Sequence, residues 1–342
     1  MLRIFGFSIL LTIASILLAF FELGWGAAIT IIVLIAIEIS FSFDNAVINA
    51  KVLERLPIIW QKIFLTVGIL IAVVGMRFVF PILIVMITAD LSWSTVVDTA
   101  LNHPDEYAKH LEEAHPSISS FGGAFLLVLS LYFFFDNARK ELWLKRIEQP
   151  LQRLGGTFWL PPVLASLVII VLSRFSHDHS TEIIQAGLAG AICYAAIRLL
   201  IEGLSRATGQ DKASADKAVK YTGWAAFVAF IYLEVLDASF SFDGVLGAFA
   251  ITDQVLLIAL GLGVGAIWVR SMTIYFVRHG TLDTYKYLEH GAHYAIFFLS
   301  VALLGSLFAH IPEAVTGITG LGIIVASFIA SREAARDHKK LL

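Results

Sequence analysis

Two copies of one short acidic motif lie in strongly apolar segments, far apart along the chain. The first copy reads Glu38-Ile39-Ser40-Phe41-Ser42-Phe43-Asp44-Asn45, and the second reads Asp237-Ala238-Ser239-Phe240-Ser241-Phe242-Asp243-Gly244, with Glu234 just upstream. Both copies contain S-F-S-F-D and an acid six residues before the last Asp. A carboxylate in such an apolar segment is costly unless it has a partner or a function. We therefore expect the chain to hold the two copies face to face as its functional site.

The polar side chains of the motifs offer only oxygen and amide groups, with neither Cys nor His. Carboxylate, amide and hydroxyl oxygens suit Mg²⁺, Ca²⁺ or Mn²⁺ better than Zn²⁺ or Cu²⁺. The sequence thus predicts a divalent-cation site near the membrane midplane, with one ion between Asp44 and Asp243. The predicted ligands are Glu38, Asp44, Asn45, Glu234, Asp237 and Asp243, supported by Ser40, Ser42, Ser239 and Ser241.

These carboxylates carry more negative charge than one divalent ion neutralises. When the site is empty, some of them must bind protons, which closely spaced acids favour, or pair with arginines. Arg77 and Arg270 lie in the apolar segments that follow the two motifs. The first alternative makes the acids proton carriers in exchange for a metal ion. In the second alternative the ion pairs only fix the packing of the helices.

Two backbone geometries fit the motifs. On an ideal helix Glu38 and Asp44 do not share a face, whereas in an extended backbone alternate residues do. We favour an extended stretch, with Glu38, Ser40, Ser42 and Asp44 on one side. Such unwinding is tolerated within a membrane only where protein or a wet cavity satisfies the backbone. A continuous helix would instead align Glu38, Ser42 and Asn45.

The composition is that of a membrane protein. Of the 342 residues, 58% are hydrophobic and 15% are charged, and the mean hydropathy is +0.83. A soluble domain carries about 25% charged residues, so the repeated apolar runs predict an all-α polytopic membrane protein. A single cysteine, Cys193, excludes a disulfide framework and a thiolate metal cluster. The apolar run after Arg3 lacks a small-residue cleavage site, so we interpret it as the first span rather than a signal peptide.

The apolar runs predict ten spans. Lys and Arg then fall almost entirely on one side of the membrane, with only Lys109 and Arg174 on the other and Arg77, Arg198 and Arg270 within spans. The positive-inside rule therefore predicts a plasma-membrane protein with both termini in the cytoplasm. The spans cover about 3–21, 27–50, 62–89, 118–137, 158–174, 183–203, 221–250, 254–278, 288–309 and 312–331.

The organisation of the chain predicts an inverted repeat. Each motif span is followed by a glycine-rich span that contains Arg77 or Arg270. The motif spans are an odd number of spans apart, so they run in opposite directions, as in many secondary transporters. The predicted parts are a peripheral helix (1–22), the first three-helix repeat (27–137), a connector with two spans (138–220), the second repeat (221–309), and a last span with a cytoplasmic tail (312–342).

Two outer segments are rich in His and acids. The loop 90–117 includes His103, His110 and His115 among several carboxylates, and the turn between the fifth and sixth spans contains His177-Asp178-His179. Charged stretches of this kind are usually solvated loops. The alternative is a surface that collects cations, since two His near a carboxylate can bind zinc.

The chain resembles the TerC family of the LysE-type transporter superfamily. The resemblance covers about residues 28–310 and depends on ordered motifs: Glu38…Asp44-Asn45, Gly122-Gly123-Ala124-Phe125-Leu126-Leu127, Glu234…Asp237…Phe240-Ser241…Asp243, Phe249-Ala250-Ile251-Thr252 and Tyr287-Leu288. Gly244 departs from the family pattern, which usually has Ser followed by Pro there. The resemblance implies efflux of metal ions, chiefly Mn²⁺, and a link to tellurite resistance, with the motif acids as ion ligands.

We therefore expect a divalent-cation transporter that exports Mn²⁺ in exchange for protons, with no permanently bound cofactor. Its expected partners are the cation, protons and the lipid bilayer, and not nucleic acid. One alternative is a membrane assembly factor or scaffold linked to metal or tellurite stress. Another is a membrane-embedded hydrolase, although neither H-E-x-x-H nor G-x-S-x-G occurs in the sequence.

Overall fold

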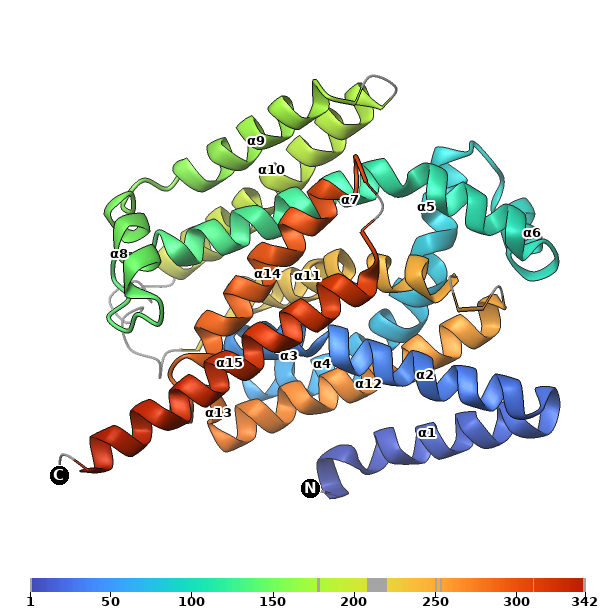
Figure 1. Cartoon of the computed structure of the whole chain (residues 1–342), viewed down its shortest axis with the longest axis horizontal. Coiled ribbons are helices and arrows are strands. Elements are labelled where there is room, and N and C mark those ends of the chain that lie inside the picture. The colour runs from blue at the N-terminus through green and yellow to red at the C-terminus, as the bar shows by residue number, and fades with distance from the viewer. Residues whose placement is uncertain are drawn as a thin grey trace.

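The computed structural model describes residues 2–176, 179–207, 220–249, 251–252, 254–309 and 311–340. Within these residues the regular secondary structure is entirely helical (Figure 1). The helices are α1 (Leu2–Leu23), α2 (Trp25–Phe41), α3 (Phe43–Leu53), α4 (Ile58–Leu70), the π-helical η1 (Ile71–Val79), α5 (Phe80–Thr88), α6 (Trp93–Asn102), α7 (Pro104–Phe134), α8 (Lys145–Arg153), α9 (Leu160–Ser173), α10 (Ser180–Ala207), α11 (Gly223–Phe249), α12 (Val255–His279), α13 (Thr281–Thr284), α14 (Leu288–Gly305) and α15 (Glu313–Lys340).

The helices confirm a multi-pass membrane protein, with a span count below the ten predicted. In the described part of the chain, eight helical stretches are long and apolar enough to cross a membrane. A ninth is obtained if α2 and α3, which meet at an angle of 53°, form one bent span. The remaining predicted span, 158–174, corresponds to α9. Its 14 residues rise only about 21 Å, against roughly 30 Å for the bilayer core.

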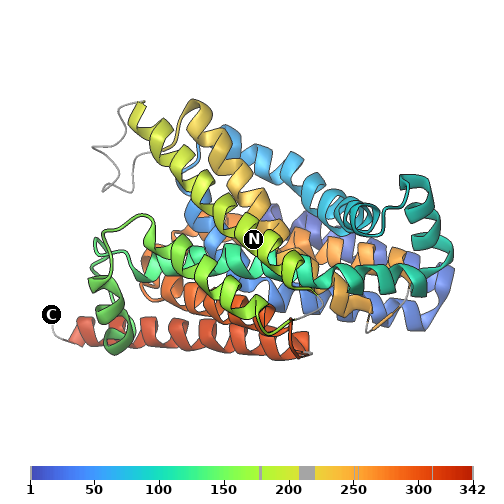
Figure 2. The same cartoon turned by 90° about the horizontal axis from the view of Figure 1, so that it is seen from above.

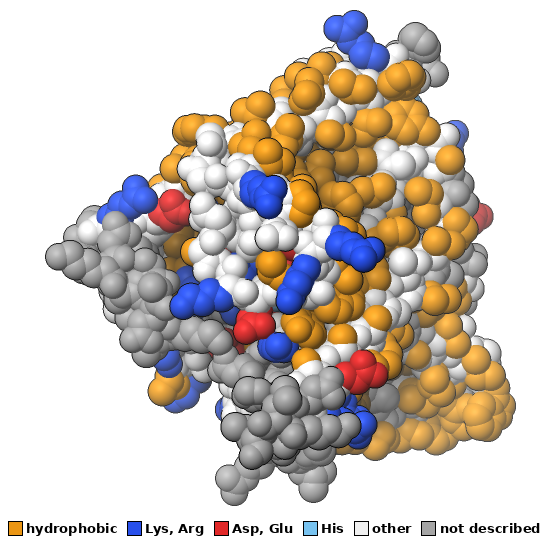
Figure 3. Space-filling model, turned by 60° about the vertical axis from the view of Figure 1, so that its left-hand side comes forward, with side chains coloured by type: hydrophobic (Ala, Val, Ile, Leu, Met, Phe, Trp, Pro, Cys, Tyr) orange, Lys and Arg blue, Asp and Glu red, His pale blue; other side chains and the backbone are white. Residues whose placement is uncertain are grey.

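The long helices pack side by side, and α15 lies along one edge of the bundle beside α14 (Figures 1 and 2). Many large apolar side chains are exposed on their outer faces, such as Leu10 of α1 and Leu256 of α12. Figure 3 looks toward the end of the molecule where α8 lies. Lys and Arg side chains gather there, while apolar side chains cover the flank. Such a surface suits a protein embedded in lipid with one basic end.

Close helix contacts at glycines bring the two halves of the sequence together. A Cβ on Gly261 of α12 would lie 2.6 Å from the Cβ of Leu34 in α2, and one on Gly265 would lie 2.5 Å from the Cβ of Glu38. No side chain fits at these separations, so α12 approaches α2 at glycine distance. The glycine-rich span of the second half therefore packs directly against the first motif.

The backbone of the motifs is helical, so the predicted extended stretch is wrong. The first copy is interrupted only at Ser42 (φ −98°, ψ 18°), where α2 ends and α3 begins. Even there the Ser42 N–H donates to Glu38 O at 3.0 Å, and the Ala46 N–H donates to Ser42 O at 3.2 Å. The second copy lies within the continuous helix α11. Helical bonds satisfy the backbone at a depth where water is scarce, which an extended strand would not do.

The outer segment 90–117 is also helical rather than a loop. It contains α6 and the start of α7. Ser92 caps α6 by accepting a hydrogen bond from the Thr95 N–H at 3.3 Å. Pro104 begins α7, and Asp105 and Glu106 occupy its first turn. Capping serines, an initial proline and acids in the first turn all favour helix starts.

Candidate functional site

Five buried charged side chains form one ion-pair network at the centre of the bundle. Arg77 bonds Glu38, and its Nη1 lies 3.8 Å from Asp237 Oδ2. Arg270 Nη2 lies 3.0 Å from Glu234 Oε2 and 3.3 Å from Asp237 Oδ2. Each of the five residues is at most 5% exposed. Asp237 therefore lies between two guanidinium groups, one from each half of the sequence.

The helices that carry the arginines are shaped to reach these acids. Arg77 lies in η1, a π-helical stretch, and its Nη1 also donates to Ala72 O at 3.3 Å. Arg270 of α12 donates to Phe64 O at 3.1 Å. A Cβ at Gly68 of α4 would collide with Arg270 Nη1, so only glycine leaves room for the ion pair there. Both arginines contact motif acids, in agreement with the sequence-based expectation.

The two motifs also meet through a direct hydrogen bond. The Asn45 side-chain Nδ2 donates to Asp237 Oδ1 at 2.8 Å. Asn45 is 2% exposed and lies in the first turn of α3, just past the break at Ser42. This bond ties the broken first motif to the continuous helix of the second motif. Figure 1 shows that α2 and α11, which carry the motifs, run in opposite directions.

Asp44 differs from the other described motif acids. It is 5% exposed, and its Oδ1 accepts a hydrogen bond from the Asn45 N–H at 2.9 Å. Among the described side chains, no Lys, Arg or His forms an ion pair with it. A buried carboxylate without a cationic partner is unfavourable unless it binds a proton or a cation.

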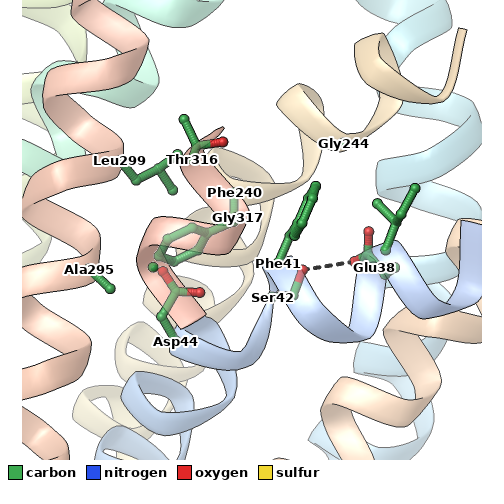
Figure 4. A pocket seen from close by; sticks show the side chains of 12 residues that line it. Glu38, Phe41, Ser42, Asp44, Phe240, Gly244, Ala295, Leu299, Thr316 and Gly317 are labelled. Atoms are coloured by element: carbon green, nitrogen blue, oxygen red, sulfur yellow. Dashed lines mark hydrogen bonds between the residues drawn. The ribbon is translucent and has the colours of Figure 1, made fainter. Parts of the chain in front are cut away.

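Asp44 borders a small cavity of about 40 Å³ at the break between α2 and α3 (Figure 4). That volume exceeds the space that one water molecule requires. The Glu38 carboxylate borders the same cavity, and its Oε1 accepts a hydrogen bond from Ser42 Oγ at 3.1 Å. The cavity is lined by Ile37, Glu38, Phe41, Ser42, Asp44, Phe240, Gly244, Ala295, Leu299, Thr316, Gly317 and Gly320. It thus combines two acids and two hydroxyls with apolar walls from α11, α14 and α15.

The described residues form no preassembled group of three or more His, Cys, Asp or Glu side chains that could hold a metal. Three of the predicted ligands, Glu38, Glu234 and Asp237, face guanidinium groups instead. Of the predicted ligands whose side chains the structure describes, Glu38 and Asp44 border the cavity. The described ligands of the predicted metal site thus lie in two different surroundings, the ion-pair network and the cavity, and do not form one coordination shell.

The four motif serines have different surroundings. Ser40 Oγ donates to Ala36 O at 2.7 Å and Ser239 Oγ donates to Val235 O at 2.9 Å, so both hydroxyls bond their own helix. Ser42 alone among the described motif serines bonds an acid. The side chains of Ser241 and Asp243 lie outside the described residues, so the pairing of Asp44 with Asp243 stays a prediction.

Sequence reasoning missed the cavity walls contributed by α14 and α15. Gly317 lies directly against the Phe41 ring, where a Cβ would collide. The small residues Gly317 and Gly320 of α15 were the available signal, because small residues mark close helix contacts in membranes.

Two of the outer histidines form local pairs, with His110 Nδ1 3.3 Å from Glu113 Oε2 and His179 Nδ1 3.3 Å from Glu182 Oε2. His177 and Asp178 lie outside the described residues.

The ion-pair network predicts a large stability effect at Arg270. The variant Arg270→Gln leaves Glu234 buried without its counter-charge, and breaking a buried pair in this way costs about 3–5 kcal/mol. Thermal unfolding in detergent should show a clearly lower midpoint. Adding Glu234→Gln to this variant should restore part of the loss. The control is Glu202→Gln, which breaks the half-exposed Arg198–Glu202 pair and should cost less than about 1 kcal/mol. Equal losses for the two single variants would contradict the prediction.

Comparison with known proteins corrects the family assignment. A family model described as "Protein of unknown function (DUF475)" matches residues 43–338. No curated protein and no solved structure matches the chain. The resemblance to the TerC family is therefore wrong. Its motifs are short, and their acids, serines and glycines are the residue types that any buried polar site between membrane helices uses. Because the match covers most of its length, the chain belongs to the DUF475 family.

Proposed function

We propose that this protein transports a hard divalent cation across the membrane in exchange for protons. The observation that carries the proposal is Asp44, a buried carboxylate that borders a cavity shared with Glu38 and has no ion-pair partner among the described side chains. Oxygen donors favour cations of the class of Mg²⁺, Ca²⁺ and Mn²⁺. The choice of Mn²⁺ and of efflux depended on the TerC resemblance, so the proposal now names only the class of ion.

The balance of buried charge supports alternate binding of a cation and protons. The described side chains of the network and cavity include four carboxylates and only two guanidinium groups. The sequence adds a further acid, Asp243, to the second motif. The two guanidinium groups carry two positive charges against four carboxylates, so two negative charges remain if all four are ionised. One divalent cation or two protons would neutralise them. Because either the cation or the protons would neutralise the site, we expect them to bind alternately rather than together.

Glu38 links the cavity to the ion-pair network. Its Oε1 bonds both Arg77 and Ser42. Its Oε2 faces Gly244, where a Cβ would lie 3.4 Å away. A cation in the cavity would attract this carboxylate while Arg77 retained Asp237 as a second partner. Entry of the ion would thus redistribute the bonds of Arg77 and could shift η1 relative to α2.

The topology that accompanies this proposal is an inverted repeat with both termini in the cytoplasm. The opposite directions of α2 and α11 and the gathering of Lys and Arg at one end support it (Figures 1 and 3). With α2 and α3 as one bent span, nine spans would place the termini on opposite sides. We therefore propose that the short helix α9 also crosses the bilayer, as a tenth span.

This topology predicts where fused reporters are active. A reporter after Leu342 and one inserted within 208–219 should both read as cytoplasmic, because an even number of spans separates these sites from each other. A reporter inserted after Ser176, between α9 and α10, should read as external. A cytoplasmic signal at that position would show that α9 does not cross and would reject the ten-span arrangement.

The cation site predicts that Asp44 is essential for transport. The variant Asp44→Asn keeps the side-chain size but removes the charge that attracts the ion and accepts the proton. Metal flux into proteoliposomes, measured for Mn²⁺, Mg²⁺, Ca²⁺ and Zn²⁺ with and without a pH gradient, should fall to the level of empty vesicles. The folded state should persist, since neutralising an unpaired buried acid removes an unfavourable charge. The control Glu112→Gln, on an exposed face of α7, should leave flux unchanged. Wild-type flux in Asp44→Asn would reject the proposal.

We propose that an ion pair between α3 and α14 controls access to the cavity from the basic end of the molecule. Lys51 at the end of α3 lies 2.7 Å from Glu289 at the start of α14. The same two helices border the cavity through Asp44 and Ala295. Both side chains of the pair are more than a quarter exposed, so water can replace the contact when the two helices separate. Such a pair can open and close during transport.

Cysteine accessibility tests this gate. The variant Cys193→Ala removes the only cysteine, and Ala295→Cys then places a thiol at the cavity. Glu289→Gln should increase the rate at which a membrane-impermeant thiol reagent reaches that position from the basic side. Exchanging the charges, Lys51→Glu with Glu289→Lys, should lower the rate again. The control Lys286→Gln breaks the exposed Lys286–Glu141 pair at the same end and should have no effect. An unchanged rate in Glu289→Gln would argue against the gate.

A further inference from the structure

The short helix α9 is flanked by two apolar grooves. The first groove, between α7, α9 and α14, has a volume of about 530 Å³. The second, between α9 and α10, has a volume of about 490 Å³. Leu167 borders both grooves and therefore forms the ridge between them. Their walls are almost entirely hydrocarbon, and each volume is in the range of sites that hold a small ligand.

Both grooves begin beside the amphipathic helix α8. Leu151 of α8 packs in the same apolar cluster as Leu131 and Leu164, which line the first groove. Trp159, which is 58% exposed, lines the second groove between the end of α8 and the start of α9. Exposed tryptophans at helix ends mark the level of the lipid headgroups in membrane proteins.

The exposed side of α8 is basic. Lys145, Arg146 and Arg153 are exposed, and none of them forms an ion pair among the described residues. The exposed apolar side chains of Leu144, Ile147 and Leu154 lie among them in the sequence. Basic and apolar residues alternate in this way on helices that lie in the plane of a membrane surface.

A buried carboxylate fixes α8 in this position. Glu148 is fully buried, and its Oε1 accepts hydrogen bonds from the Leu144 N–H at 3.1 Å and from Tyr294 O–H at 3.4 Å. Its Oε2 lies 3.3 Å from Arg139 Nη2 and 3.4 Å from His290 Nε2. The anchor joins α8 to α14, one wall of the first groove, so the basic side chains are held at the end of the grooves.

We propose that one anionic phospholipid straddles α9 as a structural lipid, with one acyl chain in each groove and its phosphate headgroup on the basic side of α8. The two apolar grooves on either side of Leu167 match the two chains. The unpaired Lys145, Arg146 and Arg153 match the negative headgroup, since each basic residue near a membrane surface attracts anionic lipid.

Native mass spectrometry and thermal unfolding in detergent test this site with two defined lipids, phosphatidylglycerol and phosphatidylcholine. Phosphatidylglycerol should remain bound and raise the unfolding temperature more than phosphatidylcholine. The variant Lys145→Gln/Arg146→Gln/Arg153→Gln should bind phosphatidylglycerol about tenfold or more weakly and lose the preference. The control Lys62→Gln/Arg332→Gln/Arg336→Gln, at exposed basic positions elsewhere, should keep the preference.

Groove-filling variants test the seats of the acyl chains. Val301 and Ala196 are exposed and line the first and second groove, respectively, so Val301→Trp and Ala196→Trp should each reduce retention of both lipids without disturbing the core. The control Leu10→Trp, on the exposed face of α1, should retain lipid normally. Equal binding of the two lipids to the wild type, a preference that survives loss of the α8 charges, or full retention in both groove variants would overturn the proposal.

Discussion

The cost of holding carboxylates in an apolar bundle governs how this protein is built. Glu38, Glu234 and Asp237 are almost completely removed from solvent, and each would be strongly unfavourable alone. Arg77 and Arg270 offset this cost, and the reach of each arginine fixes which helices must lie together. Because Asp237 contacts both guanidinium groups, the pairs η1–α2 and α12–α11 cannot move independently. The polar centre therefore determines the packing of the two halves of the sequence.

The break at Ser42 follows from the same constraint. A straight helix would carry Asp44 and Asn45 past the second motif, whereas the 53° bend between α2 and α3 lets Asn45 reach Asp237. The cavity that Glu38 and Asp44 border lies at the same break and is also lined by Phe240 and Gly244 of α11. Breaks in membrane helices are tolerated where they line a cavity. The hydrogen bond between the motifs and the space for a small cation thus have one structural origin.

Sequence reasoning identified the class of the protein and several members of its buried ion-pair network. Hydropathy was sufficient to predict a multi-pass helical membrane protein, although the described residues support eight or nine of the ten predicted spans. The cost of buried charge was sufficient to connect Arg77 and Arg270 with the motif acids. Sequence reasoning did not identify which residues contact each other across the bundle. Examples are the contacts of Asn45 with Asp237 and of Phe41 with Gly317, since each joins residues that only three-dimensional packing brings together. The period of two in S-F-S-F predicted an extended backbone, but both motifs are helical. The described serine hydroxyls bond groups four residues earlier in the sequence, which a helix brings within reach. The TerC resemblance failed for a related reason, since residues suited to buried polar chemistry recur in unrelated families.

The two motifs are similar in sequence, but the described acids of the two copies have different surroundings, and this difference supports the proposed transport function over a purely structural network. A network that only fixed helix packing would place every acid beside a guanidinium group, as is the case for Glu234 and Asp237. In the first motif, Glu38 divides its two oxygens between Arg77 and the cavity, and Asp44 has no ion-pair partner among the described side chains. In the proposed transport cycle, the continuous helix α11 and its ion pairs stay in place, whereas the bent α2–α3 span carries the acids that exchange occupants. Movement at Ser42 would then change access to Asp44 without dissolving the ion pairs that hold the bundle together.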